Sequence, residues 1–264
     1  MKINFQKYQG TGNDFIFIDN RNLFFPINDK KFIAFLCDRR FGIGADGLIL
    51  YQEHSGSDGK MVYYNSDGNQ STMCGNGGRC FAQYMRDNGI VKKNELSFMA
   101  IDGMHEAKID TSTQTVSLKM VDVTGINAIK ENEFELNTGS PHYVVNTAHE
   151  IDNMEIVTQA KFIRYNDVYT AEGINVNYMH FADDVLQIRT YERGVEDETY
   201  SCGTGVTACA LALHKDSEMA TYDVKINTKG GELSVRFNKI ADQVFTNIWL
   251  TGPAKKVFSG EINI

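Results

Sequence analysis

The sequence predicts an α+β protein of two similar lobes that arose by internal duplication. Short strand patterns separated by polar turns alternate with a few helix patterns along the chain. The glycine-rich segment that begins at Cys74 returns at Cys202, and the offset, 202 − 74 = 128, is close to half of the 264 residues. Other landmarks repeat at similar offsets, so the repeat is a lobe and not the short unit of a solenoid. In each lobe the Cys-bearing helix is expected to pack into a sheet of short strands.

The first half contains two expected helices among seven strands. Asn28 is placed to cap a short helix whose apolar residues recur at helical spacing. A second helix begins near Gly75 and ends at Asn88-Gly89, which form a good C-terminal cap. The expected strands cover residues 3–8, 15–19, 48–52, 61–65, 96–101, 105–109 and 115–121.

The second half repeats this order after a crossover at residues 123–129. Helices are expected at 154–164 and from Cys202, and strands at 134–136, 143–145, 185–192, 224–228, 233–237 and 244–250. We therefore expect an N-terminal lobe over residues 1–122 and a C-terminal lobe over 123–252. Residues 253–264 are expected to return to the N-terminal lobe.

Charge and cysteine usage exclude several classes of protein. The net charge of −8 argues against nucleic-acid binding and against an anionic membrane surface. Because the N-terminus shows no signal peptide and no apolar run could span a membrane, we expect a cytoplasmic protein with reduced thiols. The five cysteines are odd in number and widely spaced, which indicates neither a disulfide framework nor a metal site. Cys37, Cys80 and Cys209 are assigned to packing.

The two remaining cysteines, Cys74 and Cys202, are placed for acid/base chemistry. A helix N-terminus lowers the pKa of a thiol, and small residues behind it let an anion reach the free amides. We expect the two thiols to face each other across a cleft, one removing a proton from a carbon and the other returning one. Both could instead be core cysteines at tight turns, but two copies in register argue against that.

Several motifs, in this order, resemble the diaminopimelate epimerase family over nearly the whole chain. They are Gly12-Asn13-Asp14-Phe15, Gly42-Ile43-Gly44-Ala45-Asp46-Gly47, Asn65 nine residues before Cys74-Gly75-Asn76-Gly77, Ser140-Pro141-His142, Gly173-Ile174-Asn175-Val176, Glu192-Arg193-Gly194, Cys202-Gly203-Thr204-Gly205 and Thr251-Gly252-Pro253-Ala254. Each motif alone is weak, but the ordered set is specific.

The resemblance implies an epimerase that interconverts LL- and meso-2,6-diaminoheptanedioate for lysine and peptidoglycan synthesis, without pyridoxal phosphate or a metal. It implies two lobes with curled, mostly antiparallel sheets that close over this small-molecule substrate, and a homodimer. Cys74 and Cys202 would be the acid/base thiols, tuned by His142 and Glu192. The implied substrate contacts are Asn13, Asn65, Gly75, Asn76, Ser140, Asn175, Glu192, Arg193, Gly203 and Thr204.

Two positions depart from the family pattern. Ser140 stands where many members carry asparagine, and Gly47 stands where some carry glutamine. A serine hydroxyl can still donate or accept a hydrogen bond, so Ser140 remains a candidate contact and Gly47 does not.

The plainer interpretations are a solvated turn for His142, a surface ion pair for Glu192 and Arg193, and turn formation for the asparagines.

Three other functions stay open on the sequence alone. A proline or hydroxyproline racemase would use the same pair of thiols, and a related isomerase would carry a carboxylate in place of one. A non-catalytic amino-acid-binding module would exchange no substrate proton. If the two sulfurs flank one carbon, oxidation is expected to join Cys74 and Cys202 in a disulfide and abolish activity.

Overall fold

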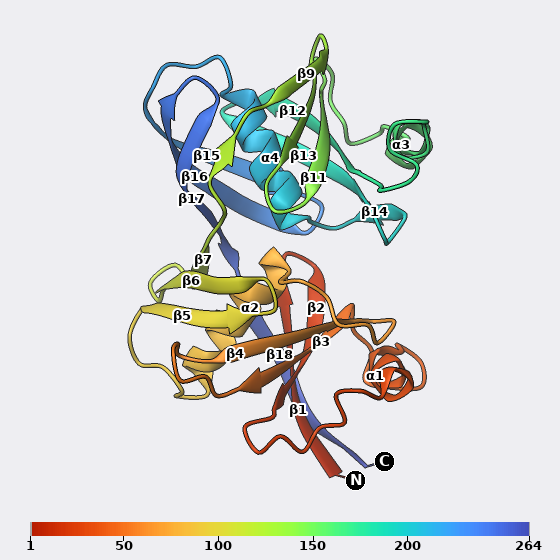
Figure 1. Cartoon of the computed structure of the whole chain (residues 1–264), viewed down its shortest axis with the longest axis vertical. Coiled ribbons are helices and arrows are strands. Elements are labelled where there is room, and N and C mark those ends of the chain that lie inside the picture. The colour runs from red at the N-terminus through yellow and green to blue at the C-terminus, as the bar shows by residue number, and fades with distance from the viewer. Residues whose placement is uncertain (1, 264) are drawn as a thin grey trace. The chain divides into compact units, whose positions relative to one another are not determined.

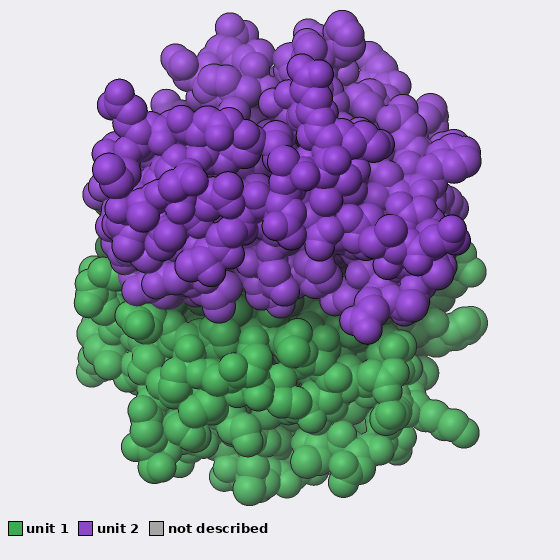
Figure 2. Space-filling model, turned by 45° about the horizontal axis from the view of Figure 1, so that its top comes forward, with its two compact units in different colours: residues 1–118, 252–264 green, residues 119–251 purple. Residues whose placement is uncertain are grey.

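The structure is a computed structural model that describes residues 2–263. The chain divides into two compact units (Figure 2): unit 1 comprises residues 1–118 and 252–264, and unit 2 comprises residues 119–251. Each unit contains a mixed, mainly antiparallel sheet and two helices, one of which runs through its centre (Figure 1). The predicted α+β fold class with two duplicated lobes is confirmed.

Unit 1 is built from eight strands around the helix α2 (Gly75–Asp87). The strands are β1 (Lys2–Gly10), β2 (Asn13–Asp19), β3 (Gly47–Gln52), β4 (Lys60–Asn65), β5 (Glu95–Ala100), β6 (Gly103–Asp110), β7 (Thr115–Lys119) and β18 (Lys255–Asn263). They pair in the order β18-β1-β2-β3-β4-β5-β6-β7. Because α2 contacts β1, β2, β3, β6 and β18, the sheet curls around it.

Unit 2 repeats this plan around the helix α4 (Gly203–Leu213). Its strands are β8 (Val123–Thr124), β9 (Asn127–Lys130), β10 (Glu133–Asn137), β11 (Pro141–Asn146), β12 (Asn175–Ala182), β13 (Val185–Glu192), β14 (Asp197–Thr199), β15 (Thr221–Thr228), β16 (Gly231–Ala241) and β17 (Val244–Pro253). The order is β9-β10-β11-β12-β13-β15-β16-β17-β8, and β14 pairs with β13.

The parallel strand pairs show why each unit needs two helices. In unit 1, β2 and β3 are parallel and joined through α1 (Lys30–Cys37), and β4 and β5 are parallel and joined through α2. In unit 2, α3 (Ile156–Arg164) joins β11 to β12, and α4 lies between β13 and β15. Parallel neighbours require such crossovers, so the position of each Cys-bearing helix follows from the strand order.

The two central helices are buried nearly all round. In α2, 10 of 13 residues are buried, and in α4, 9 of 11 are buried. A helix with so little exposed surface belongs inside its sheet. Cys80 and Cys209 have no exposed surface, and Cys37 is 3% exposed, so the packing role predicted for these three cysteines is confirmed.

The structure corrects several local predictions. Asp29, not Asn28, caps α1, because its Oδ1 accepts a hydrogen bond from the amide of Phe32 at 3.0 Å. The segment 123–129 is not a plain crossover but contains β8 and most of β9. The segment between the expected strand at 185–192 and Cys202 contains β14. These strands are two to four residues long, too short to show the alternation by which a strand is recognised.

Candidate functional site

The two Cys-bearing helices begin in the same way. Cys74 is the N-cap of α2 with φ −92° and ψ 132°, and Cys202 is the N-cap of α4 with φ −115° and ψ 111°. The first intrahelical hydrogen bonds run from the Gly78 amide to the Cys74 carbonyl (2.7 Å) and from the Val206 amide to the Cys202 carbonyl (2.8 Å). The amides of the first turn precede these bonds, so each helix directs donors and a positive dipole end toward its own cysteine.

In unit 1, Asn13 holds the residues around Cys74 together. Its Oδ1 lies 3.6 Å from the Cys74 sulfur and 3.5 Å from the Asn76 Nδ2, both of which can donate to it. Its own Nδ2 donates to Asp46 Oδ2 at 2.6 Å. Three predicted site residues, Asn13, Cys74 and Asn76, are therefore joined in this unit.

A charged cluster fixes the strand that carries Asn13. Asp14 pairs with Arg39 at 2.7 Å and with Lys7 at 2.8 Å, and Arg39 also pairs with Asp46 at 2.8 Å. Burial raises the pKa of Asp14, but the hydrogen bonds from Arg39 and Lys7 outweigh it and lower the pKa to about 2. Asp14 is therefore ionised at any physiological pH, and the start of β2 stays anchored.

Asn65 and Gly47 lie opposite each other on β4 and β3. Within residues 2–263, the Asn65 side chain makes no hydrogen bond, so its predicted contact has no support in this unit. Gly47 has no room for a side chain, because a Cβ there would lie 2.6 Å from the Tyr63 ring and 2.6 Å from the Tyr64 carbonyl oxygen. This crowding accounts for a glycine at this position.

In unit 2, the first turn of α4 lies against a buried polar network. Cys202 Sγ is 3.5 Å from Thr204 Oγ1. The fully buried His142 accepts a hydrogen bond at Nδ1 from Asn177 Nδ2 (3.1 Å), and Thr190 Oγ1 donates to Asn177 Oδ1 (3.0 Å). A Cβ on Gly205 would lie 3.3 Å from the His142 ring and 2.3 Å from Asn177 Oδ1, so only glycine allows this approach.

His142 is a neutral imidazole whose proton sits on Nε2. Burial, reinforced by the positive charge of Arg193, lowers its pKa from 6.5 to about 3, although the Asn177 hydrogen bond opposes this. Because Nδ1 accepts a hydrogen bond, the proton must be on Nε2, which has no partner among the described residues. His142 is therefore not a solvated turn residue, and it presents an unused donor.

A second cluster in unit 2 joins three further predicted residues. Asn175 Nδ2 donates to Ser140 Oγ (2.9 Å) and to the Pro141 carbonyl (3.0 Å). Asn175 Oδ1 accepts from the backbone amide of Arg193 at 2.9 Å. The Arg193 guanidinium donates to the Glu172 carbonyl at 2.9 Å and remains exposed, which leaves its outer edge open to a carboxylate.

Glu192 ends β13, beside Arg193, and is half-buried. Its backbone pairs with Asp197, and its carbonyl accepts from the Glu196 amide at 2.8 Å. These bonds close the tight loop that follows β13, so the backbones of Glu192 and Arg193 are held at the end of that strand.

Two residues that the sequence analysis passed over belong to these arrangements. Asn177 orients His142 from the neighbouring parallel strand, and Arg79 is fully buried one turn behind Cys74. The pairing of His142 with Asn175 across β11 and β12 brings Asn177 within reach, although 35 residues separate Asn177 from His142 in the sequence. Neither residue lies at a position that a spacing rule would single out.

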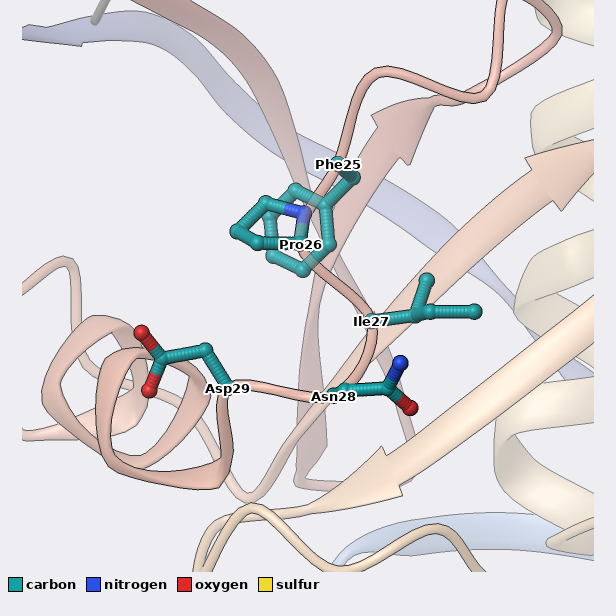
Figure 3. A pocket seen from close by; sticks show the side chains of 5 residues that line it. All are labelled: Phe25, Pro26, Ile27, Asn28 and Asp29. Carbon is teal, nitrogen blue, oxygen red and sulfur yellow. The ribbon is translucent and has the colours of Figure 1, made fainter.

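The pocket in Figure 3 is not part of these arrangements. It has a volume of about 590 Å³ and is lined by the consecutive residues Phe25, Pro26, Ile27, Asn28 and Asp29 before α1. It contains none of the predicted site residues, and Asp29 is already engaged as a helix cap.

Within residues 2–263, no three His, Cys, Asp or Glu side chains are grouped so that they could hold a metal ion. No helix in the described part of the chain is long and apolar enough to cross a membrane.

Comparison with known proteins gives a consistent family assignment. The family model described as diaminopimelate epimerase matches residues 5–125 and 134–257. A diaminopimelate epimerase of Flavobacterium psychrophilum is 51% identical over 97% of this chain and 98% of its own length. One from Chlorobaculum tepidum is 39% identical over 97% and 99%.

Solved structures that resemble the chain show its fold. A phenazine biosynthesis protein of the PhzF family from Bacillus anthracis matches with a TM-score of 0.75 and 12% identity over the whole of both chains. A hydroxyproline epimerase from Agrobacterium vitis matches with a TM-score of 0.68 and 13% identity, over 99% of this chain and 92% of its own. At such low identity these two establish the architecture alone.

Proposed function

The chain belongs to the diaminopimelate epimerase family, and on that premise we propose that Cys74 and Cys202 are its two acid/base residues. The family makes the protein an isomerase that interconverts LL- and meso-2,6-diaminoheptanedioate at the α-carbon, a step in lysine and peptidoglycan precursor synthesis, by proton transfer between thiolate and thiol and without a cofactor. The observation that carries the proposal is the shared geometry of the two helix N-termini, each opened by a cysteine in extended conformation.

Inversion at a carbon needs a base for one face and an acid for the other. One cysteine, as thiolate, removes the α-proton, and the other, as thiol, delivers a proton to the opposite face. The carbanion that forms places negative charge on the α-carboxylate. The amides of Gly75 and Asn76, and those of Gly203 and Thr204, are the donors proposed for it, since they precede the first intrahelical bond of each helix.

The remaining polar residues would hold the rest of the substrate. Arg193 is proposed for the distal carboxylate, because an exposed guanidinium can bind it with two parallel hydrogen bonds. Asn13, Asn65, Ser140, Asn175 and the Glu192 carboxylate are proposed for the ammonium and carboxylate groups. His142 and Glu192 are proposed to tune the cysteines, His142 through the donor at Nε2.

Three further properties are part of the proposal. Units 1 and 2 are the two lobes of the family fold, and the protein works as a homodimer. It works in the cytoplasm, where reducing conditions keep its five free cysteines as thiols. Oxidation of Cys74 and Cys202 to a disulfide would inactivate it.

The test is turnover of the LL-isomer in deuterium oxide by the wild type, Cys74→Ala and Cys202→Ala. Each substitution is expected to reduce formation of the meso-isomer by about 10²–10⁴-fold, because each removes one proton-transfer group. The α-carbon of the wild-type product should carry solvent deuterium. Cys80→Ala and Cys209→Ala are matched controls in the same two helices and should retain turnover within about tenfold. Wild-type turnover by either Cys74→Ala or Cys202→Ala would rule the proposal out, as would turnover of proline but not of diaminopimelate.

A further inference from the structure

Arg79 is a buried cation without a carboxylate partner. Its side chain lies in α2, five residues after Cys74, and none of it is exposed. Across residues 2–263, no acidic side chain forms an ion pair with it, and its Nε and Nη1 atoms have no hydrogen-bond partner. A guanidinium stays protonated at physiological pH, and removing such a charge from water is costly unless an anion compensates it. A negative charge close to the Arg79 guanidinium is therefore expected.

The one engaged nitrogen of Arg79 points into the arrangement around Cys74. Nη2 donates to Asn76 Oδ1 at 3.0 Å and to Thr11 Oγ1 at 3.0 Å. These bonds fix the Asn76 amide so that its Nδ2 faces Asn13 Oδ1, the atom that the Cys74 sulfur also approaches. Gly10 packs closely against this region, since a Cβ there would lie 3.3 Å from the Asn76 carbonyl oxygen and 3.3 Å from the Cys80 sulfur.

Two sulfur atoms are close enough to interact electrostatically with the guanidinium, those of Cys80 and Cys74. Burial raises the pKa of Cys80 to about 12, so Cys80 is a neutral thiol near neutral pH. Cys74 is only half-buried and lies at a helix N-terminus, where a thiolate is favoured. Of the two, Cys74 is the sulfur that can supply the missing negative charge.

Two carboxylates close to Cys74 already have partners of their own. Asp102 Oδ1 accepts a hydrogen bond from the Met73 amide (3.4 Å) and pairs with His105 at 3.3 Å. Asp46, which binds the far side of Asn13, pairs with Arg39. Neither carboxylate is paired with Arg79, so neither removes its effect on the sulfur.

The matching residue of α4 is Thr207, at the same offset of 207 − 79 = 128. Thr207 is buried, but its hydroxyl only donates back to the Gly203 carbonyl of its own helix at 2.9 Å. Position 207 of α4 therefore carries a neutral hydroxyl where α2 carries the buried Arg79. The duplicated helices differ by one full charge at this point.

We propose that Arg79 is a positioning residue that orients Asn76 and Asn13 around Cys74 and makes Cys74, rather than Cys202, the thiolate of the resting enzyme. The inference rests on the proposed acid/base role of Cys74 and deepens it. The free enzyme would then remove a proton with Cys74 and donate one from Cys202. Each turnover in that direction would leave Cys74 as the thiol and Cys202 as the thiolate, and a proton must return from Cys74 to Cys202 before the next one.

The first test needs no substitution at Arg79. The ultraviolet absorbance of thiolate near neutral pH is measured on wild type, Cys74→Ala and Cys202→Ala. The buried cysteines contribute nothing, because burial raises the pKa of Cys37 and of Cys80 to about 12 and also raises that of Cys209. The signal should disappear in Cys74→Ala and persist in Cys202→Ala. Loss of the signal in Cys202→Ala, or an equal division between the two variants, would overturn the inference.

The second test assigns the effect to Arg79. The pH dependence of iodoacetamide alkylation is followed at each cysteine by peptide mass mapping in Arg79→Gln and Arg79→Lys. In Arg79→Gln the midpoint for Cys74 should rise by about one to two pH units and that for Cys202 should not move. Arg79→Lys should restore most of the effect, and Thr207→Val, the matched control in α4, should leave the Cys74 midpoint unchanged.

A folded Arg79→Gln protein with a wild-type Cys74 midpoint, or with equal shifts at both cysteines, would show that Arg79 is merely structural. If Arg79→Gln does not fold, the absorbance comparison still tests whether Cys74 is the thiolate of the resting enzyme. Neither result depends on turnover, so a failure of this inference is distinguishable from a failure of the acid/base assignment, which the epimerase assay tests.

Discussion

The first turns of α2 and α4 share a backbone plan and differ in where their polar support lies. Under α4 the sheet supplies it, through His142, Asn177 and Thr190. Under α2 the matching sheet positions hold Phe15, Ile49 and Tyr63, and a Cβ on Gly77 would meet the ends of Ile49, Met61 and Phe15.

In unit 1, Asn13 on β2 contacts Cys74 and Asn76, and the buried charge comes from the helix itself, as Arg79. Duplication has therefore preserved the thiol and its amides while the electrostatic surroundings have diverged: one half has a buried cation and the other a buried neutral imidazole. The two thiols proposed as the acid and the base are therefore placed in different environments.

The largest effect expected from this difference is the pH dependence of stability at His142. Its folded pKa of about 3 lies below the unfolded value of 6.5, so the stabilisation from the neutral ring is complete above pH 6.5 and is lost as the pH falls toward 3. The loss between pH 6.5 and pH 4 should be roughly 3 kcal/mol. The free energy of unfolding, measured with urea at several pH values across that range, should depend less steeply on pH in His142→Phe than in the wild type. The phenylalanine is the residue found at the matching position in unit 1.

His214→Asn is the control for the His142 prediction, since burial also lowers the pKa of His214, a partly buried ring away from α4's first turn. Removing His214 should also lower the pH dependence of stability, but by less than His142→Phe does, because the His214 ring is only partly buried. An unchanged slope in His142→Phe would mean that His142 is not buried neutral in solution.

A smaller effect should separate Gly205 from Gly77, the third residues of the two helices. In Gly205→Ala the new methyl would lie 2.3 Å from Asn177 Oδ1, an atom held by Thr190. Overpacking of this kind costs about 1–3 kcal/mol, which exceeds the roughly 1 kcal/mol that alanine gains over glycine within a helix.

In Gly77→Ala the methyl meets the flexible ends of Ile49 and Met61 at 3.2 and 3.3 Å, so the change should be within about 0.5 kcal/mol of neutral. Chemical unfolding of both variants measures the difference. Equal losses of stability would show that the polar network under α4 is no more rigid than the apolar packing under α2.

The smallest effect is expected at Ser140, which matches Asn13 in the plan of the two units. Ser140→Ala removes one hydrogen bond of Asn175, which keeps its bond to the Pro141 carbonyl. The cost in stability should be about 0.5–1.5 kcal/mol, and KM for diaminopimelate should rise less than tenfold. In Asn13→Ala, where two contacts of the first turn are lost, the kinetic effect should be larger. A greater loss in Ser140→Ala would indicate that the serine binds substrate more strongly than its geometry suggests.

The fold class could be predicted from the sequence because duplication displays the same pattern twice. The helices α2 and α4 were recognisable from their glycines and the cap at Asn88-Gly89, which the structure confirms with Gly89 at φ +67°. The strands β8 and β9 were not recognisable: β8 has two residues and β9 is exposed along its whole length, so neither shows a buried face.

The candidate site shows a similar division. The glycines and cysteines are visible because a helix N-terminus that an anion can approach needs small residues in its first turn. Arg79 was not predicted, since an arginine in a helix normally faces solvent, whereas here it is fully buried beside Gly10. Asn177 was missed because its link to His142 depends on the register between two parallel strands.

The pairing of β18 with β1 has a consequence for biosynthesis. Unit 2 is contiguous in sequence and possesses all of its strands once Thr251 has been made, whereas unit 1 must wait for β18 to cover the edge of β1. During translation, the later half of the duplication can therefore reach its native state before the earlier half does. An uncovered β1 edge is a temporary liability for aggregation, which a shortened chain lacking β18 would make permanent.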